Sequence, residues 1–431
     1  EAIMAWTDLI EKHAGTTAMA SGLLARADAR QRIGDPAGGL ADCRRFLDDS
    51  RLQQKLDQAA IAEASYIQGL CLAGQEKHAQ AAATFRKLLA ETPDFPAADR
   101  ATFELGLALA NAGRPDDAAT VFGDLVKRFP ESTYAADAWL EIGERQWAAE
   151  KWPTAAEAYR ETIAAAGDSP ELASLVEQAR HKLGWTHVMR DDDAAAAEAF
   201  AAQLQAAPNG PLAPDAAVML GDALVSLGRM DEASRALNRA LADPTAISTD
   251  ALRDLAFLRA AEAAAARDAW QESLEIATRC LTVRPDSPRG PEARYAAGWA
   301  LHNLGRLDEA AAAYREAAAG PPTELAARAR MMEGEVLFEQ KRHKDAIKAF
   351  FKAAYGFGDS PPPAFHPWQA QATFEAARCF EVLGQPQQAR TLYAELVERY
   401  PGCEHAPAAR KRLAALDRRE STRPAAPGAS S

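Results

Sequence analysis

The fold is decided by residues 106–130, which read GLALANAGRPDDAATVFGDLVKRFP. Counted from Gly106, Ala118 follows after 12 residues, Phe122 after 16 and Pro130 after 24. This spacing of small, small, aromatic and proline positions recurs, with substitutions, from nine other residues at intervals of 36 to 43. We call the ten starting residues the anchors: Ala27, Gly69, Gly106, Gly143, Gly184, Gly221, Ala261, Gly298, Gly334 and Ala377. Ten copies of one pattern indicate a chain built from structural repeats.

Each copy reads as two helices joined by a tight turn. Gly113 is expected in the left-handed conformation, which ends a helix without a Cβ clash. Pro115 fits the first turn of the second helix, where no amide donor is lost, and Pro130 ends that helix. Small residues at the anchor and 12 residues later let the two helices approach closely. The aromatic residue four positions further on is expected to fill the core between hairpins.

These residues resemble the tetratricopeptide repeat (TPR) family, whose repeat has a small residue in the first helix, Ala and an aromatic in the second, and a terminating Pro. The resemblance implies an all-α, right-handed superhelical α-solenoid of about ten TPR-like helix hairpins. The copies are longer than the usual period of about 34 residues. Long copies such as residues 128–139 and 398–406 resemble bacterial periplasmic TPR proteins, namely the Tol–Pal-associated coordinator and the outer-membrane assembly lipoprotein. That likeness favours the periplasm or cell envelope, with the cytoplasm as the alternative.

The repeats imply a division of the chain into four parts. Residues 1–14 are expected to be the second helix of a truncated repeat, so that the chain starts inside a longer solenoid. Residues 15–404 hold the ten repeats, and residues 405–419 form a C-terminal capping helix. Residues 420–431 are predicted to be a disordered tail, because they are too small and polar to pack.

Composition and motifs exclude several classes of function. The 431 residues carry 49 basic and 61 acidic side chains, a net charge of −12, which disfavours nucleic acid as the partner. No apolar run approaches the roughly 20 residues of a membrane-spanning helix, so we expect no membrane insertion. Zinc-protease, phosphate-loop, nucleophile-elbow and dinucleotide motifs are missing, and no catalytic residue, cofactor or metal site is predicted.

Histidines, aspartates and cysteines receive structural interpretations. His181 and His187 are six residues apart, on different helical faces, which does not suit a metal pair. Asp191, Asp192 and Asp193 are expected to favour the start of a second helix. Four of the five cysteines occupy small apolar positions of the repeat and are predicted to pack there. Cys403 lies in a loop.

In TPR proteins, residues three before, one after and four after the anchor form a stripe that faces the concave groove. By this resemblance we expect a partner-binding groove in which aromatic side chains are interspersed with carboxylates. The predicted groove residues are Tyr66, Phe103, Glu144, Trp147, His181, Trp185, Asp222, Glu262, Tyr295, Trp299, His302, Glu335, Phe338, Phe374 and Arg378. Trp185 and Trp299 are expected to lack a core partner. The alternative is that an aromatic stripe at helical spacing belongs to the core.

The predicted function is therefore a non-enzymatic protein–protein interaction scaffold, which binds a protein or peptide of aromatic and basic character in a cell-envelope assembly. The alternative is the repeat region of a larger enzyme or signalling protein whose catalytic domain lies upstream. The oligomeric state is not predicted.

Overall fold

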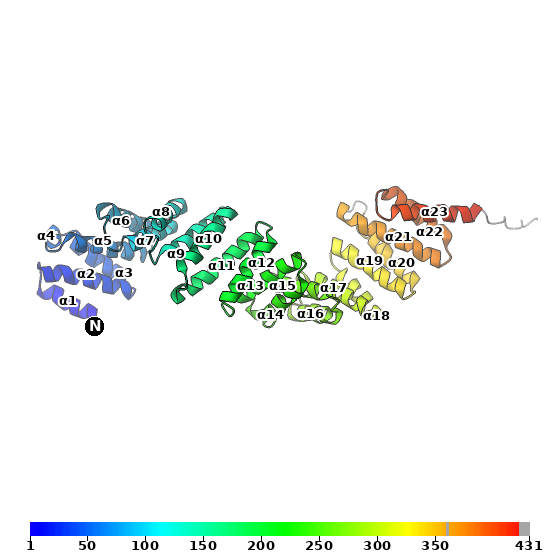
Figure 1. Ribbon diagram of the computed structural model, residues 1–431, viewed down its shortest axis with the longest axis horizontal. Helices are drawn as coiled ribbons and strands as arrows, with labels where there is room; N and C mark the ends of the chain where they lie inside the picture. Colours follow the sequence, from blue (N-terminus) through cyan, green and yellow to red (C-terminus); the bar gives the residue numbers. More distant parts are fainter. Residues whose placement is uncertain (359–361, 422–431) are drawn as a thin grey trace, which may run out of the picture. The chain divides into compact units, whose positions relative to one another are not determined.

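The computed structural model describes residues 1–358 and 362–421 (Figure 1). In this part of the chain the regular structure is helical throughout, with 23 α-helices, three short 3₁₀ turns and no strand. The structure divides into two compact units, Glu1–Ala213 and Pro214–Ser431. The predicted all-α class is confirmed, and the chain is a helical solenoid of repeats.

Unit 1 contains the first twelve helices and one 3₁₀ turn. They are α1 (Ala2–Lys12), α2 (Thr17–Arg32), α3 (Pro36–Leu47), α4 (Ser50–Gln53), α5 (Gln58–Ala73), α6 (His78–Glu91), α7 (Ala98–Asn111), α8 (Pro115–Arg128), α9 (Ala135–Ala148), α10 (Trp152–Ala166), η1 (Pro170–Leu172), α11 (Ala173–Val188) and α12 (Asp193–Ala206).

Unit 2 contains the remaining helices, and α13 begins at the boundary residue itself. They are α13 (Ala213–Ser226), α14 (Met230–Ala240), η2 (Pro244–Ala246), α15 (Asp250–Ala265), α16 (Trp270–Val283), α17 (Gly290–Asn303), α18 (Leu307–Ala317), α19 (Glu324–Glu339), α20 (His343–Tyr355), η3 (Pro363–Phe365), α21 (His366–Val382), α22 (Pro386–Arg399) and α23 (Ala406–Ser421).

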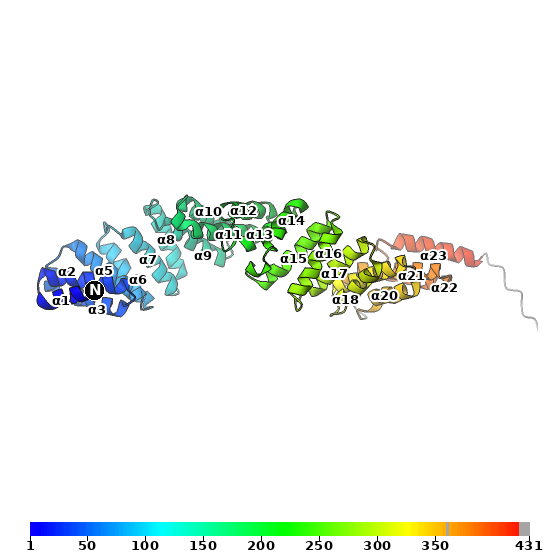
Figure 2. The same ribbon diagram turned by 90° about the horizontal axis from the view of Figure 1, so that it is seen from below.

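Ten helix pairs account for all the anchors, beginning with α2 and α3 and ending with α21 and α22. Within each unit the helices follow one another in chain order in both views (Figure 1, Figure 2). α1 lies within the segment predicted as 1–14. α23 runs to Ser421, two residues into the predicted tail, and residues 422–431 lie outside the described residues.

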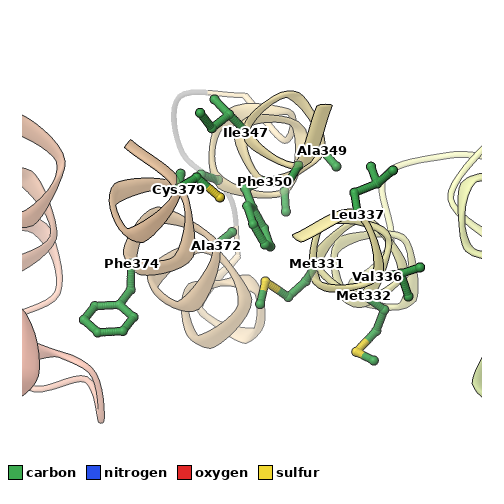
Figure 3. Close-up of a cluster of buried hydrophobic side chains, with 14 of the residues drawn as sticks. Met331, Met332, Val336, Leu337, Ile347, Ala349, Phe350, Ala372, Phe374 and Cys379 are labelled. Carbon is green, nitrogen blue, oxygen red and sulfur yellow. The ribbon is translucent and has the colours of Figure 1, made fainter. Parts of the chain in front are cut away.

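The anchors are small because an aromatic ring of the second helix lies against them. A Cβ added to Gly106 would lie 2.4 Å from Cε1 of Phe122, and one added to Gly334 would lie 2.3 Å from Cε1 of Phe350. Phe122 is 2% exposed and Phe350 is fully buried. Figure 3 shows Phe350 projecting from α20 toward side chains of the neighbouring helices α19 and α21. The ring therefore fixes the contact between the two helices of a hairpin.

The turn between the two helices of each hairpin has one residue in the left-handed conformation, seven residues after the anchor. Gly113 has a φ of +75° there, and the predicted turn glycines Gly228, Gly305 and Gly384 behave alike. Five hairpins carry a side chain at this position: Glu76, Glu150, Asp191, Asp268 and Lys341. Positive φ strains such residues by about 1–2 kcal/mol each, and the surrounding hairpin holds them in place.

The structural interpretations of the other polar and sulfur-containing residues are also confirmed. Asp192 caps the start of α12 by accepting a hydrogen bond from the amide of Ala195 at 3.1 Å. The four cysteines predicted to pack are buried, and Cys403 is half-buried in the loop before α23. All five are reduced.

Candidate functional site

The candidate site is the first-helix face, which we define in each unit by the residues six, three and two before and one and four after the anchors. At 100° per residue these five positions span one side of the helix. The sequence prediction used only three of them. Of its 15 residues, three are buried, ten are half-buried and two, Glu262 and Trp299, are exposed.

Two of the predicted aromatic residues on unit 1 complete the core. Tyr66 on α5 is buried, with its ring centroid 5.9 Å from that of Phe85 and 5.7 Å from that of Phe95. Phe103 on α7 lies 5.7 Å from Phe122 and stacks on Tyr134 at 5.4 Å. Tyr66 and Phe103 therefore join neighbouring hairpins, as the core alternative predicted.

Trp185 on α11 also has a core partner, contrary to the prediction. Its ring meets Phe200 edge-on at 6.4 Å, and its Nε1–H donates a hydrogen bond to Nε2 of His181 at 2.9 Å. Because indole nitrogen only donates, Nε2 of His181 accepts and Nδ1 carries the proton, which points to Oε1 of Gln203 at 3.2 Å. The spacing of one helical turn places His181 beneath Trp185, a contact that the prediction overlooked.

Glu144 on α9 is held between two neighbouring helices. It accepts a hydrogen bond from the hydroxyl of Tyr159 at 2.9 Å and pairs with Nζ of Lys182 on α11 at 2.9 Å. The same ammonium lies 5.4 Å from the ring of Trp147, which packs edge-on against Trp152 at 4.9 Å. Burial and the nearby Glu144 carboxylate raise the pKa of Tyr159. Glu144 is thus a structural carboxylate as much as a surface one.

A corresponding ion pair occurs on unit 2 between α13 and α15. Nε of Arg259 lies 2.6 Å from Oδ1 of Asp222, and its Nη1 lies 2.8 Å from Oε2 of Glu262. Lys182 and Arg259 both stand two residues before an anchor, and Glu144 and Asp222 both stand one residue after the preceding anchor. The residue two before an anchor therefore reaches the preceding first helix.

Trp299 on α17 is the most exposed aromatic residue of the first-helix face. It is 37% exposed, and its only ring contact in the described part of the chain is with Trp270, edge-on at 6.5 Å. The equivalent positions on the helices before and after it hold Glu262 and Glu335. Burial raises the pKa of Glu335, and the nearby Glu375 raises it further.

The remaining predicted residues of unit 2 form a row of cation–ring and ion-pair contacts. The guanidinium of Arg328 lies 4.7 Å from the ring of the buried Tyr295, and that of Arg378 lies 5.2 Å from the ring of Phe338. Nε2 of His302 lies 3.0 Å from Oε2 of Glu339. Phe374 is buried and stacks on His405 at 5.2 Å. Tyr295 and Phe374 thus belong to the core, as Tyr66 does.

Four carboxylates on unit 1 belong to the first-helix face but were missed by the three-position stripe: Glu63, Glu104, Asp137 and Glu141. None of their side chains has an ion pair or a side-chain hydrogen bond to another described residue. Burial raises the pKa of each of them. Their spacing of six or two residues before the anchors could have identified them in the sequence.

A separate cavity of about 580 Å³ lies beside α21 and the loop before α23. His366, Trp368, Tyr400, Cys403 and His405 are among its lining residues. His366 packs against Tyr400 at 5.5 Å, and Nε1 of Trp368 donates to Glu324 at 3.2 Å. In residues 1–358 and 362–421, no group of three or more His, Cys, Asp or Glu side chains is placed to hold a metal ion. None of the described helices has the length and apolar character needed to cross a membrane.

Two family models, both described as tetratricopeptide repeat, match most of the chain. The first matches residues 24–96, 103–170, 181–251, 250–324 and 319–362, and the second matches residues 371–402. Comparison with curated protein sequences gave no significant match.

Solved structures of similar fold are distant from this chain. A tetratricopeptide repeat protein from Parabacteroides merdae is 12% identical with a TM-score of 0.41, and the match covers 65% of this chain and 98% of that one. YrrB, described as a TPR protein with an unusual peptide-binding site, is 16% identical with a TM-score of 0.37, over 51% and 97% of the two chains. PilF of Pseudomonas aeruginosa is 17% identical with a TM-score of 0.37, over 54% and 95%. None of the matches supports the more specific likeness to the Tol–Pal coordinator or the outer-membrane assembly lipoprotein.

Proposed function

Because the chain belongs to the tetratricopeptide repeat family, we propose that it is a non-enzymatic scaffold that binds a protein or peptide through the first-helix faces of its repeats. The family fold is a non-catalytic scaffold type, and TPR proteins generally mediate protein–protein interaction. The single observation that supports the proposal best is the position of Trp299. A large aromatic side chain remains exposed between two carboxylates of the same face.

Trp299 has the properties of an interface anchor. Trp is enriched among the residues that dominate binding energy, and its ring offers a large apolar area at a small cost in conformational entropy. Its contact with Trp270 fixes one edge of the ring and leaves more than a third of the side chain to a partner. The neighbouring Glu262 and Glu335 favour a partner segment that carries basic as well as aromatic groups.

Replacing Trp299 with Ala is expected to weaken partner binding by about 2 kcal/mol or more, roughly thirtyfold in Kd, with little change in thermal stability. The partner is first captured from a lysate of the source cells with the parent chain and identified by mass spectrometry. Its Kd is then measured by calorimetry for the parent and the variant.

Tyr355→Ala is the matched control, because Tyr355 is 39% exposed but lies on α20, a second helix. The control should bind the partner as the parent does. Equal affinity of the parent and Trp299→Ala, or an equal loss in the control, would contradict the proposed site.

The cell-envelope role remains a prediction of the sequence, since it rests on the wording of loops. The coding sequence upstream of residue 1 tests it. A lipoprotein or secretion signal there would support the envelope, and a catalytic domain would support the alternative function.

A further inference from the structure

Two carboxylates on unit 1 occupy positions that form ion pairs elsewhere in the chain. Glu104 on α7 and Glu141 on α9 each stand two residues before an anchor, as Lys182 and Arg259 do. Lys182 reaches Glu144 on the preceding first helix at 2.9 Å, and Arg259 reaches Asp222 at 2.6 Å. In the same register, the residues that correspond to Glu144 and Asp222 on the helices preceding Glu104 and Glu141 are Leu70 and Leu107. These leucines offer no charge, so both carboxylates lack the partner that this register supplies at the other two sites.

The environment of both groups is unfavourable for a negative charge. Burial is the largest cause that raises the pKa of Glu104, and Arg100 partly opposes it. The pKa of Glu141 is raised by burial and further by Glu144 and Asp137, with no cation among the causes. Asp137 and Glu141 are also one helical turn apart, where like charges destabilise a helix. A ligand that brings positive charge would relieve all of these effects.

A buried hydroxyl at the same place also lacks a partner. The hydroxyl oxygen of Tyr66 is buried and forms no hydrogen bond in the described residues, and the side chain is 4% exposed. The charges of Arg100, Glu104 and Glu63 all act on the pKa of Tyr66, so the hydroxyl points into the carboxylate row. A tyrosine hydroxyl accepts a hydrogen bond from an ammonium or guanidinium group. This second, independent feature indicates that the row is incomplete without a cationic ligand.

Resting on the proposed function, we propose that α5, α7 and α9 bind an extended, cationic protein segment with Lys or Arg at about every third residue. Packed helices are about 8–10 Å apart. A polyproline II segment rises about 3.1 Å per residue and has three residues per turn, so every third side chain points the same way about 9 Å further on. Basic side chains at that spacing would meet successive carboxylates of the row. Leu70 and Leu107 suit the aliphatic stems of those side chains.

The probe is a fluorescent peptide of four Lys-Pro-Pro triplets, and binding to the full chain is followed by anisotropy at low salt. We expect saturable binding that weakens as salt is added. An isomer with the four lysines in one block should bind at least about tenfold more weakly, and a Gln-Pro-Pro peptide should not bind. Equal affinity for the triplet and block peptides would overturn the spacing part of the proposal.

The double variant Glu104→Gln/Glu141→Gln should lose at least about tenfold in affinity for the Lys-Pro-Pro peptide. The matched control is Glu157→Gln/Glu161→Gln, which makes the same change in net charge on α10, a second helix. Equal losses in both double variants would show that the net charge of the chain attracts the peptide, and would overturn the proposed site. If a captured partner is lost by Trp299→Ala but still bound by Glu104→Gln/Glu141→Gln, the proposed function stands and this inference fails.

The same double variant should be as stable as the parent or more stable at pH 7. A carboxyl whose pKa is higher in the folded chain than in the unfolded chain destabilises the fold once the pH exceeds the unfolded value. Glutamine removes that effect, so a rise in Tm is expected at pH 7 and should disappear near pH 4, where the carboxyls are protonated in both states. The charged groups that act on these two glutamates are Arg100, Asp137 and Glu144, the last of which pairs with Lys182. A loss of binding accompanied by a lower Tm at pH 7 would instead indicate that the variant is misfolded, and would contradict the charge argument.

Discussion

Replacing Phe122 with Ala is expected to lower the free energy of unfolding of its repeat by about 3–5 kcal/mol. The ring is 2% exposed, lies 5.7 Å from that of Phe103 and covers Gly106. Truncation removes the contact within the hairpin α7–α8 and leaves a cavity that helices fixed by their neighbours cannot close fully. In a repeat protein each repeat contacts chiefly its neighbours, so the loss should be local. Hydrogen exchange in α7 and α8 should accelerate more than about a hundredfold, and that in α19 and α20 should not change.

Gly106→Ala gives the control for this explanation. Its new Cβ would lie 2.4 Å from Phe122, too close for a ring enclosed on all sides. The double variant Gly106→Ala/Phe122→Ala should therefore lose less than the sum of the two single variants. The chain already uses that combination at Ala261 and Ala277, the equivalent positions of another repeat. Additive losses would show that the ring and the anchor do not act on each other.

The fold could be predicted because one spacing encodes several contacts at once. The glycine anchors, the aromatic ring 16 residues later and the turn glycine all lie within a single hairpin, so their spacing is visible along the sequence. The turns with Glu150 or Lys341 are less visible. These residues adopt a left-handed conformation that their own preference disfavours, because the hairpin on either side imposes it.

The candidate site could be predicted only in part, because its contacts run between repeats. The stripe located Trp299 correctly on an exposed face, but it could not show that Tyr66 packs between Phe85 and Phe95. The ion pair of Lys182 with Glu144 depends on how far one first helix is displaced along the next. Repeats of unequal length vary that displacement, and a single spacing ruler does not give it. Glu104 and Glu141 were missed for the same reason.

Asp42 is the residue whose loss should have the largest electrostatic effect. It is 3% exposed on α3 and accepts from two arginines of α2. Its Oδ1 lies 2.6 Å from Nη2 of Arg26 and its Oδ2 lies 2.9 Å from Nη1 of Arg30. Asp42→Ala leaves the buried Arg26 with only Thr7 as a hydrogen-bond partner, at 2.9 Å. Breaking a buried pair in this way should cost about 3–5 kcal/mol, measured by hydrogen exchange in α2 and α3.

The double variant Arg26→Leu/Asp42→Val separates the charge from the packing. Arg26 precedes its anchor by one residue and Asp42 follows it by 15, and the equivalent positions around Gly106 hold Leu105 and Val121. An apolar pair that the chain already packs elsewhere should recover most of the loss, because a buried ion pair costs much of its attraction in desolvation. Asp8→Ala, which breaks an exposed pair with Lys12, should cost less than about 1 kcal/mol. If Asp42→Ala costs no more than Asp8→Ala, the pair does not stabilise the hairpin. If the double variant is worse than Asp42→Ala, the charges are required for packing and not merely tolerated in it.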